Sequence, residues 1–207
     1  MKRTKISFVG EKPIFTGSPQ IVPGGFNLDR EKQRFSVGDI IPAGTLAIFD
    51  EVTRKVQIVK TAKVKVITLY SNGYCSPCFS VGDKLLQAKS VSGTFEGAPS
   101  IVSIEKPGVS NAPYVITLSA EISGLAVDDV LVEVVESSTN AAVIGEPNSL
   151  TIEEVTVKEF ETAIDVTEDT MQYAVMERRV LPIPDSMKDS TKRYLKANSH
   201  IRLSQTY

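Results

Sequence analysis

Two cysteines, Cys75 and Cys78, form a Cys-x-x-Cys motif, and their types and spacing indicate chemistry more directly than any other residues of this chain. In thiol–disulfide exchange the first thiolate of such a pair attacks a disulfide, and the second resolves the mixed product. Cys75 would be the nucleophile and Cys78 the resolving thiol. This chemistry needs a helix directly after the first cysteine, because the helix N-terminus lowers the thiol pKa.

The elements around the motif decide whether it can work in this way. The segment 66–91 resembles the opening of a glutaredoxin or thioredoxin-type fold, with a strand, the motif and an amphipathic run. However, the run contains Gly82, which costs a helix about 1 kcal/mol relative to Ala. It also begins with FSVGD, a string that occurs earlier in front of Pro42, where a long helix cannot continue. A thioredoxin-type fold also needs a crossover helix of a dozen or more residues, and the segment 105–112 is too short for one.

Other reactive groupings have little support in the residue types. His200 is the single histidine, so a Ser-His-Asp triad would depend on a residue near the end of the sequence. Structural zinc needs four ligands, and one cysteine pair with one distant histidine does not form such a pattern. Phosphate-binding loops and HExxH motifs are absent from the sequence. We therefore expect no catalytic residue, no metal and no cofactor.

The string FSVGD occurs twice, at 35–39 and 79–83, and a weaker copy, LAVDD, spans 125–129. An apolar, strand-like run follows each copy, which is typical of a β-structure that reuses one turn. Glycine adopts positive φ readily, and an Asp carboxylate accepts a hydrogen bond from a nearby backbone N–H. Asp, which takes the glycine position in the third copy, tolerates the same region. The predicted turn-forming residues are Gly38, Asp39, Gly82, Asp83, Asp128 and Asp129.

Alternating and β-branched runs predict a mainly β fold. Val56, Ile58 and Val64 alternate with polar or basic residues, which is the period-2 pattern of a half-buried strand. Dense turn signals favour a small barrel or sandwich over a sheet of βαβ units. The expected organisation is an extended Pro/Gly-rich arm at 1–30, a β domain with the repeated turns at 31–136, a linker at 137–150, and a C-terminal strand and helix segment at 151–207.

The two ends of the chain hold apolar residues that need a partner. Within 151–207 a short helix is expected at 185–196, because Ser186 can cap it and Asp189 follows three residues later. The aromatic residues of the arm either cover the chain's own sheet or dock on a neighbouring subunit. The candidate partner contacts are Phe15, Ile21, Phe26, Tyr194, Ile201 and Leu203.

Composition argues against several classes of partner. The formal net charge of −2 gives no basic footprint for nucleic acid. No segment approaches the roughly 18 consecutive apolar residues of a membrane helix, and the N-terminus lacks a signal-peptide pattern. With a hydrophobic content of 42%, the chain can build a core. We expect a soluble protein made in the cytoplasm, with no nucleic-acid and no membrane partner.

Four stretches of the sequence carry a resemblance to one known protein family, which is more specific than the general β pattern. They are GEKPIFTGSPQIVPGGFNLDR at 10–30, FSVGDIIPAGTLAIFDEVTRKVQIVKTAKV at 35–64, YVITLSAEISGLAVDDVLVEVVE at 114–136 and MERRVLPIPDSMKDSTKRYLKANSHIRLSQTY at 176–207. With these stretches the chain resembles the phage head fibre, or capsid decoration, family of tailed phages and prophages. The shared motifs are turn and strand patterns, so the resemblance transfers no catalytic residue and no role for the two cysteines.

The resemblance implies a non-enzymatic structural protein on the capsid surface of a virion. It would bind the phage major capsid protein as a homo-oligomer, with a trimer as the favoured order. It would be synthesised in the cytoplasm of a bacterial host and not be secreted by a signal peptide.

A glutaredoxin- or thioredoxin-like thiol-disulfide oxidoreductase using Cys75 and Cys78 is one alternative. A carbohydrate- or surface-binding β module is another, which would stack sugars on Tyr70, Tyr74 or Tyr114; Trp is absent and aromatic residues make up only 7%.

Overall fold

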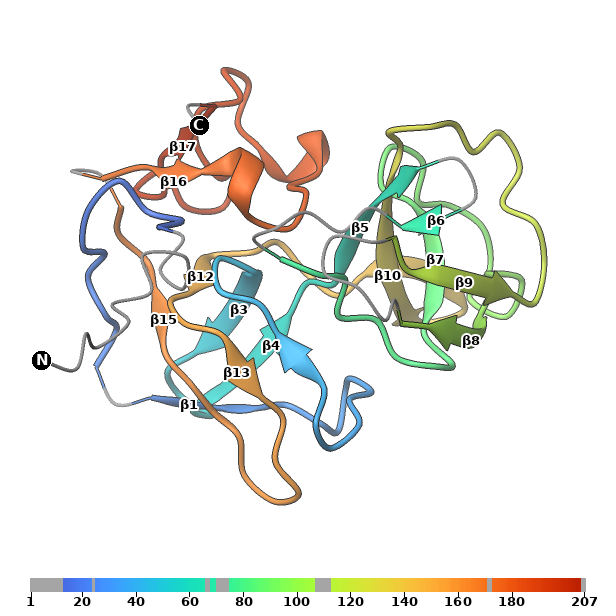
Figure 1. Cartoon of the computed structure of the whole chain (residues 1–207), viewed down its shortest axis with the longest axis horizontal. Helices are drawn as coiled ribbons and strands as arrows, with labels where there is room; N and C mark the ends of the chain where they lie inside the picture. The colour runs from blue at the N-terminus through green and yellow to red at the C-terminus, as the bar shows by residue number, and fades with distance from the viewer. Residues whose placement is uncertain are drawn as a thin grey trace, which may run out of the picture.

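Strands dominate the computed structural model, which describes residues 13–23, 25–65, 68–69, 75–106, 113–170 and 173–205. The prediction of a mainly β fold is confirmed (Figure 1). Within the described residues, helical structure is limited to two 3₁₀ turns, η1 (Glu177–Arg179) and η2 (Asp185–Met187). Neither is long enough to span a membrane.

A six-stranded sheet forms a nearly closed barrel in the order β14-β1-β4-β3-β12-β15. Its edge strands β14 and β15 are separated in the chain only by Asp165, which brings the two edges of the curled sheet together. β1 runs parallel to β4, and the other neighbours are antiparallel. The bounds are β1 (Phe26–Leu28), β3 (Leu46–Asp50), β4 (Lys55–Ile58), β12 (Ser149–Thr151), β14 (Ala163–Ile164) and β15 (Val166–Thr167).

The barrel-like sheet follows the predicted alternation. In β4 the side chains of Val56 and Ile58 are fully buried, whereas Lys55 and Gln57 are half-buried. Phe26 of β1 packs into the same core against Phe49 of β3, with ring centroids 5.0 Å apart. Alternate residues of neighbouring strands therefore build one apolar interior, as period-2 patterning requires.

A second sheet of five strands lies beside the barrel-like sheet (Figure 1). Its order is β11-β10-β5-β6, and β7 also pairs with β10. A separate hairpin of β8 and β9 packs against it, and the two share a core that includes Leu85, Ile101 and Leu131. The bounds are β5 (Thr61–Lys65), β6 (Thr68–Leu69), β7 (Lys84–Gln87), β8 (Ile101–Glu105), β9 (Val115–Leu118), β10 (Val130–Ser137) and β11 (Asn140–Val143).

Two short pairs complete the strands. β2 (Ile40–Ile41) pairs with β13 (Val155–Thr156), and β16 (Val175–Met176) runs parallel to β17 (Leu203–Ser204). Phe15 forms a β-bridge with Val175, so the first described residues of the chain pair with the C-terminal segment that contains β16.

The strands do not follow the expected segment boundaries. The barrel-like sheet takes β1 from the arm expected at 1–30, and β12, β14 and β15 come from beyond residue 148. β11, at Asn140–Val143, occupies part of the linker expected at 137–150. Residues 1–12 of the arm lie outside the described residues. Closing a barrel needs pairings between distant segments, which composition along the chain does not reveal.

The helix expected at 185–196 is wrong. Only the single 3₁₀ turn η2 forms, and its N-cap is Pro184 without a side-chain cap. Asp189, expected to complete the capping of a helix start, instead accepts hydrogen bonds from the backbone N–H groups of Arg193 and Tyr194, at 2.9 and 3.0 Å. The carboxylate therefore holds a loop, a competing use of Asp that works against helix formation.

Candidate functional site

The three repeated strings form the same turn. Gly38 and Gly82 both have a φ of 90°, and Asp128, which takes the glycine position in the third copy, has a φ of 72°. The carboxylate of the following Asp accepts a hydrogen bond from the backbone N–H three residues earlier, at 2.7 to 2.8 Å in all three turns. The predicted turn-forming residues therefore occupy equivalent positions in three copies of one structural unit.

Each turn also docks on the rest of the fold in the same way. The N–H of the residue with positive φ donates to the carbonyl of a buried residue, whose own N–H donates back to the carbonyl of the turn Asp. These partners are Val157, Ile101 and Val64 for the first, second and third turns, with distances of 2.8 to 2.9 Å. The sequence repeat is thus a repeat of hydrogen bonding, with one buried partner for each turn.

The three turn carboxylates differ in their surroundings. Asp129 is half-buried, and hydrogen bonds from Lys89 and from the Ala126 N–H hold its pKa below the ordinary value. Asp39 is partly exposed and accepts a hydrogen bond from the Ser80 hydroxyl at 3.2 Å. Asp83 is buried and faces a lysine. Only the second turn therefore brings its carboxylate into the interior.

Lys60 lies in the link between β4 and β5, where the chain leaves the barrel-like sheet for the second sheet. Its side chain is fully buried. Lys60 Nζ lies 2.7 Å from Asp83 Oδ2 and 3.4 Å from Glu133 Oε1, and it donates to the Arg34 carbonyl at 2.6 Å. We call Lys60, Asp83 and Glu133 the junction cluster, because they join the two sheets.

Glu133 comes from β10, in the middle of the second sheet. Gln33 donates to its Oε2 at 2.9 Å and also donates to the Ile58 carbonyl of the barrel-like sheet. Burial raises the pKa of the Glu133 carboxyl to about 7, although the positive charge of Lys60 acts in the opposite direction. The cluster therefore holds a carboxyl group that can take up and release a proton near neutral pH.

Water is largely excluded from the junction cluster. The Phe35 ring covers the ammonium group, with Lys60 Nζ 4.2 Å from the ring centroid. Asp83 Oδ2 accepts the Ser80 N–H, whereas Asp83 Oδ1 is buried without a hydrogen-bond partner. A buried carboxylate oxygen without a partner is costly, and this one marks Asp83 as the least satisfied member of the cluster.

Sequence reasoning assigned Asp83 to a turn but missed Lys60 and Glu133. The signal was present in the parity of the strands. Lys60 has the same parity as the buried residues Val56, Ile58 and Ala62, so alternation places it on the apolar face. A lysine at an inward-facing position is rare unless it is paired, and such a position predicts a buried carboxylate nearby.

Neither of the two cysteines forms a disulfide, and both are buried. The residues after Cys78 form an irregular segment and then the second repeated turn, so no helix follows the motif. Burial raises the pKa of the Cys78 thiol to about 12. The raised pKa belongs to the thiol that would resolve the mixed disulfide, and the nucleophile Cys75 lacks the helix N-terminus that would activate it. The site therefore gives no support to the thiol-disulfide alternative.

Cys78 is expected to resist thiol reagents in the native state. In a Cys75→Ser variant, labelling of Cys78 by a maleimide or an aromatic disulfide at pH 8 should be at least about 100-fold slower than in denaturant, because the thiolate is scarce and buried. Absorbance of the aromatic thiol that the disulfide releases follows the second reaction, and the added mass follows the maleimide reaction. Native labelling as fast as that of the denatured chain would contradict this placement of the thiol.

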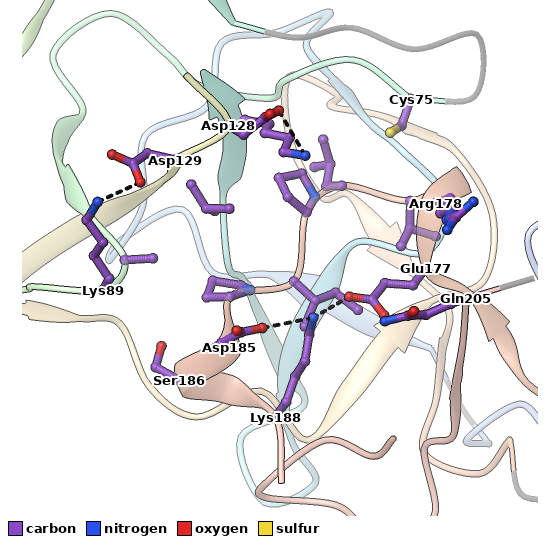
Figure 2. A pocket seen from close by; sticks show the side chains of 18 residues that line it. Cys75, Lys89, Asp128, Asp129, Glu177, Arg178, Asp185, Ser186, Lys188 and Gln205 are labelled. Atoms are coloured by element: carbon purple, nitrogen blue, oxygen red, sulfur yellow. Dashed lines mark hydrogen bonds and ion pairs between the residues drawn. The ribbon is translucent and has the colours of Figure 1, made fainter. Parts of the chain in front are cut away.

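A cleft of about 830 Å³ lies between the third turn and the segment 177–188 (Figure 2). Its walls carry opposite charges that pair with one another: Lys89 with Asp129 at 2.7 Å, Lys63 with Asp128 at 3.0 Å, and Lys188 with Glu177 and Asp185. Figure 2 shows Cys75 at the rim, apart from these pairs. Within the described residues, no group of three or more His, Cys, Asp or Glu is placed to hold a metal ion.

Most of the candidate partner contacts are used within the chain. Phe26 fills the barrel-like sheet, and Phe15, Ile201 and Leu203 belong to a core formed with the C-terminal segment. Tyr194 is half-buried and bridges to Arg202, so Ile21 is the one clearly exposed member, at 57%. For the sugar-binding alternative, Tyr114 is half-buried, and Tyr70 and Tyr74 lie outside the described residues.

Comparisons of the chain with models of known protein families, with curated proteins and with solved structures found no match.

Proposed function

We propose that this chain is a non-enzymatic structural protein of a phage virion, a head fibre or decoration protein that binds the major capsid protein on the capsid exterior. The observation that carries the proposal is the resemblance of four stretches, at 10–30, 35–64, 114–136 and 176–207, to that family. The mainly β fold is compatible with it. Such a protein acts through a stable scaffold and an exposed contact, and it needs no reactive site.

The best candidate for the capsid contact is the loop between β13 and β14. Its Phe160 side chain is 84% exposed. Arg30 holds the loop by donating to the carbonyls of Lys158 and Glu159, at 3.1 and 2.9 Å. The Lys158 N–H also donates to the Thr162 hydroxyl at 2.9 Å. An aromatic side chain on a loop that is already ordered loses little entropy on binding, and aromatic residues are frequent anchors of interfaces.

This assignment revises the expected contact surface. Phe15, Phe26, Ile201 and Leu203 would have to leave the chain's own core before they could bind a capsid. Phe160 needs no such rearrangement, and Ile21 is the second exposed candidate. We propose that the protein binds the capsid as a homo-oligomer, with a trimer as the first state to test by light-scattering mass.

Co-sedimentation with assembled capsids tests the proposal. The probe is the shell formed by the major capsid protein of the same phage or prophage genome. We expect the protein to sediment with the shells and Phe160→Asp to weaken binding by about tenfold or more, because one anchor residue is worth over 1 kcal/mol. Val52→Asp is the matched control, since Val52 is 92% exposed on the turn between β3 and β4.

The outcomes separate the parts of the proposal. Absence of binding by the folded wild-type protein would overturn the capsid assignment. Binding that is equally strong in wild type, Phe160→Asp and Val52→Asp would keep the capsid assignment and remove the loop from it. An Ile21→Asp variant would then test the remaining exposed candidate of the arm.

A further inference from the structure

The junction cluster contains the three groups that an amide-forming reaction between side chains requires. Lys60 supplies an amine, and Asp83 supplies a carboxyl carbon whose Oδ2 is 2.7 Å from Lys60 Nζ. Glu133 supplies a second carboxyl group, 3.4 Å from the same nitrogen. They come from the β4–β5 link, the second turn and β10, so the fold brings them together from distant positions.

The surroundings favour condensation over hydrolysis. The side chains of Lys60 and Asp83 are both fully buried, and the Phe35 ring shields the amine. Removal of water favours amide formation, since water is a product. Two groups held in contact also react with effective molarities on the order of 10⁵–10⁸ M when their orientation is correct.

The charges favour the same outcome. One ammonium faces two carboxylates in the interior, and burial of such ions costs several kcal/mol for each ion. An amide between Lys60 and Asp83 removes one positive and one negative charge together. Glu133 then keeps its hydrogen bond from Gln33.

We propose that Lys60 and Asp83 form an intramolecular isopeptide bond, with Glu133 as the group that transfers the protons. The bond joins Lys60 Nζ to Asp83 Cγ and closes residues 60–83 into a covalent ring at the junction of the two sheets. The inference does not depend on the proposed binding to capsids, because it rests on contacts inside the chain.

The step is balanced without any co-reactant. A first proton passes from Lys60 Nζ through Glu133 to Asp83 Oδ1, and the neutral amine attacks Asp83 Cγ. The Ser80 N–H, which donates to Oδ2 at 2.8 Å, stabilises the negative charge that forms on this oxygen. Glu133 then takes a second proton from the nitrogen and delivers it to Oδ1, the oxygen without a hydrogen-bond partner, which now carries two protons. The Cγ–Oδ1 bond breaks, one water leaves, and Glu133 ends in its starting state.

Glu133 is well suited to this transfer for two reasons. It contacts the amine directly, and Gln33 fixes its carboxyl group by donating to Oε2. Its pKa of about 7, raised by burial, matches the range in which general acid–base groups work at neutral pH. The alternative state is a permanent ion pair, in which the ammonium group of Lys60 keeps Asp83, Glu133 and the Arg34 carbonyl as its acceptors.

Intact mass of the purified, denatured protein distinguishes these states. We expect the wild-type mass to fall below the sequence mass by one water molecule, and a digest to contain one peptide in which the segments with Lys60 and Asp83 are joined. Fragment spectra must place the link on these residues, because an internal Asp succinimide has the same mass. A wild-type protein with the full sequence mass, and without the joined peptide, would overturn the proposal.

Variants test the role of each group. Lys60→Arg keeps a cation but cannot form the amide, so it should have its full sequence mass. Glu133→Gln keeps a side chain of the same size and should also have its full mass, with the joined fraction falling from nearly complete to undetectable. Glu136→Gln, on the same strand but exposed, is the matched control and should lose one water as wild type does. Circular dichroism establishes that each variant folds.

If folded Glu133→Gln shows the mass lower by one water as completely as wild type does, Glu133 is not the group that transfers the protons. Loss of water in Lys60→Arg would overturn the bond itself. Because the wild-type measurement needs no variant, the proposal stays testable even if a substitution prevents folding.

Discussion

Lys60→Met is expected to lower the free energy of unfolding by about 3–5 kcal/mol. The substitution removes the side chain that neutralises Asp83, either as an ammonium ion or through the proposed amide, while the volume of the side chain stays similar. Two carboxylates are then buried without a positive partner, and Asp83 Oδ1 already lacks a hydrogen bond. Chemical denaturation followed by circular dichroism measures the loss.

Lys63→Met is the matched control for this prediction. Lys63 lies three residues later on β5, and its ion pair with Asp128 is exposed to solvent. Exposed pairs contribute about 0–1 kcal/mol, so the control should lose little stability. Equal losses in the two variants would show that burial of the cluster carries no special cost. Adding Asp83→Asn and Glu133→Gln to Lys60→Met should recover part of the stability, because these changes remove both uncompensated charges.

Phe26→Ala is expected to cost about 3–5 kcal/mol, because the change leaves a cavity in the barrel-like sheet. Phe26 is 1% exposed, contacts the Phe49 ring and lies under Arg54, whose Cζ is 4.3 Å from the ring centroid. Phe160→Ala is the matched control, because that side chain lies in solvent and should contribute less than about 0.5 kcal/mol. Thermal and chemical denaturation of both variants give the comparison.

Truncation of the arm is expected to disrupt the barrel-like sheet. Removing residues 1–28 would delete β1, which lies between β14 and β4. The expected result is a loss of cooperative unfolding, and not only a loss of partner binding. A folded protein after this truncation, or a Phe26→Ala variant as stable as Phe160→Ala, would contradict the position of β1 in the sheet.

The repeated turn was predictable because its physics is local. Gly38 and Gly82 occupy positions with positive φ, and the Asp of each copy bonds to a backbone N–H only three residues away. Neither feature depends on distant parts of the chain. The alternation of β4 was predictable for the same reason, since the period of two belongs to the strand itself.

The parts that the sequence did not predict depend on distant contacts. Apolar side chains at Phe15 and Ile201 indicate a need for burial, but they do not say whether the cover is the same chain or a partner. Asp189 had the spacing of a helix cap, yet the carboxylate bonds to the loop that follows it. The alternation of the sequence places Lys60 at an inward-facing position, whereas its pairing with Glu133, far along the chain, needed the fold.

Saturable binding to assembled capsids tests the central claim most directly. A shell offers a fixed number of equivalent sites, so the amount of wild-type protein that sediments with shells of the same genome's major capsid protein should rise to a plateau. Phe160→Asp should move the curve to concentrations about tenfold higher or more, and Val52→Asp should follow the wild-type curve. A folded wild-type protein that stays in the supernatant at every concentration would contradict the proposed function.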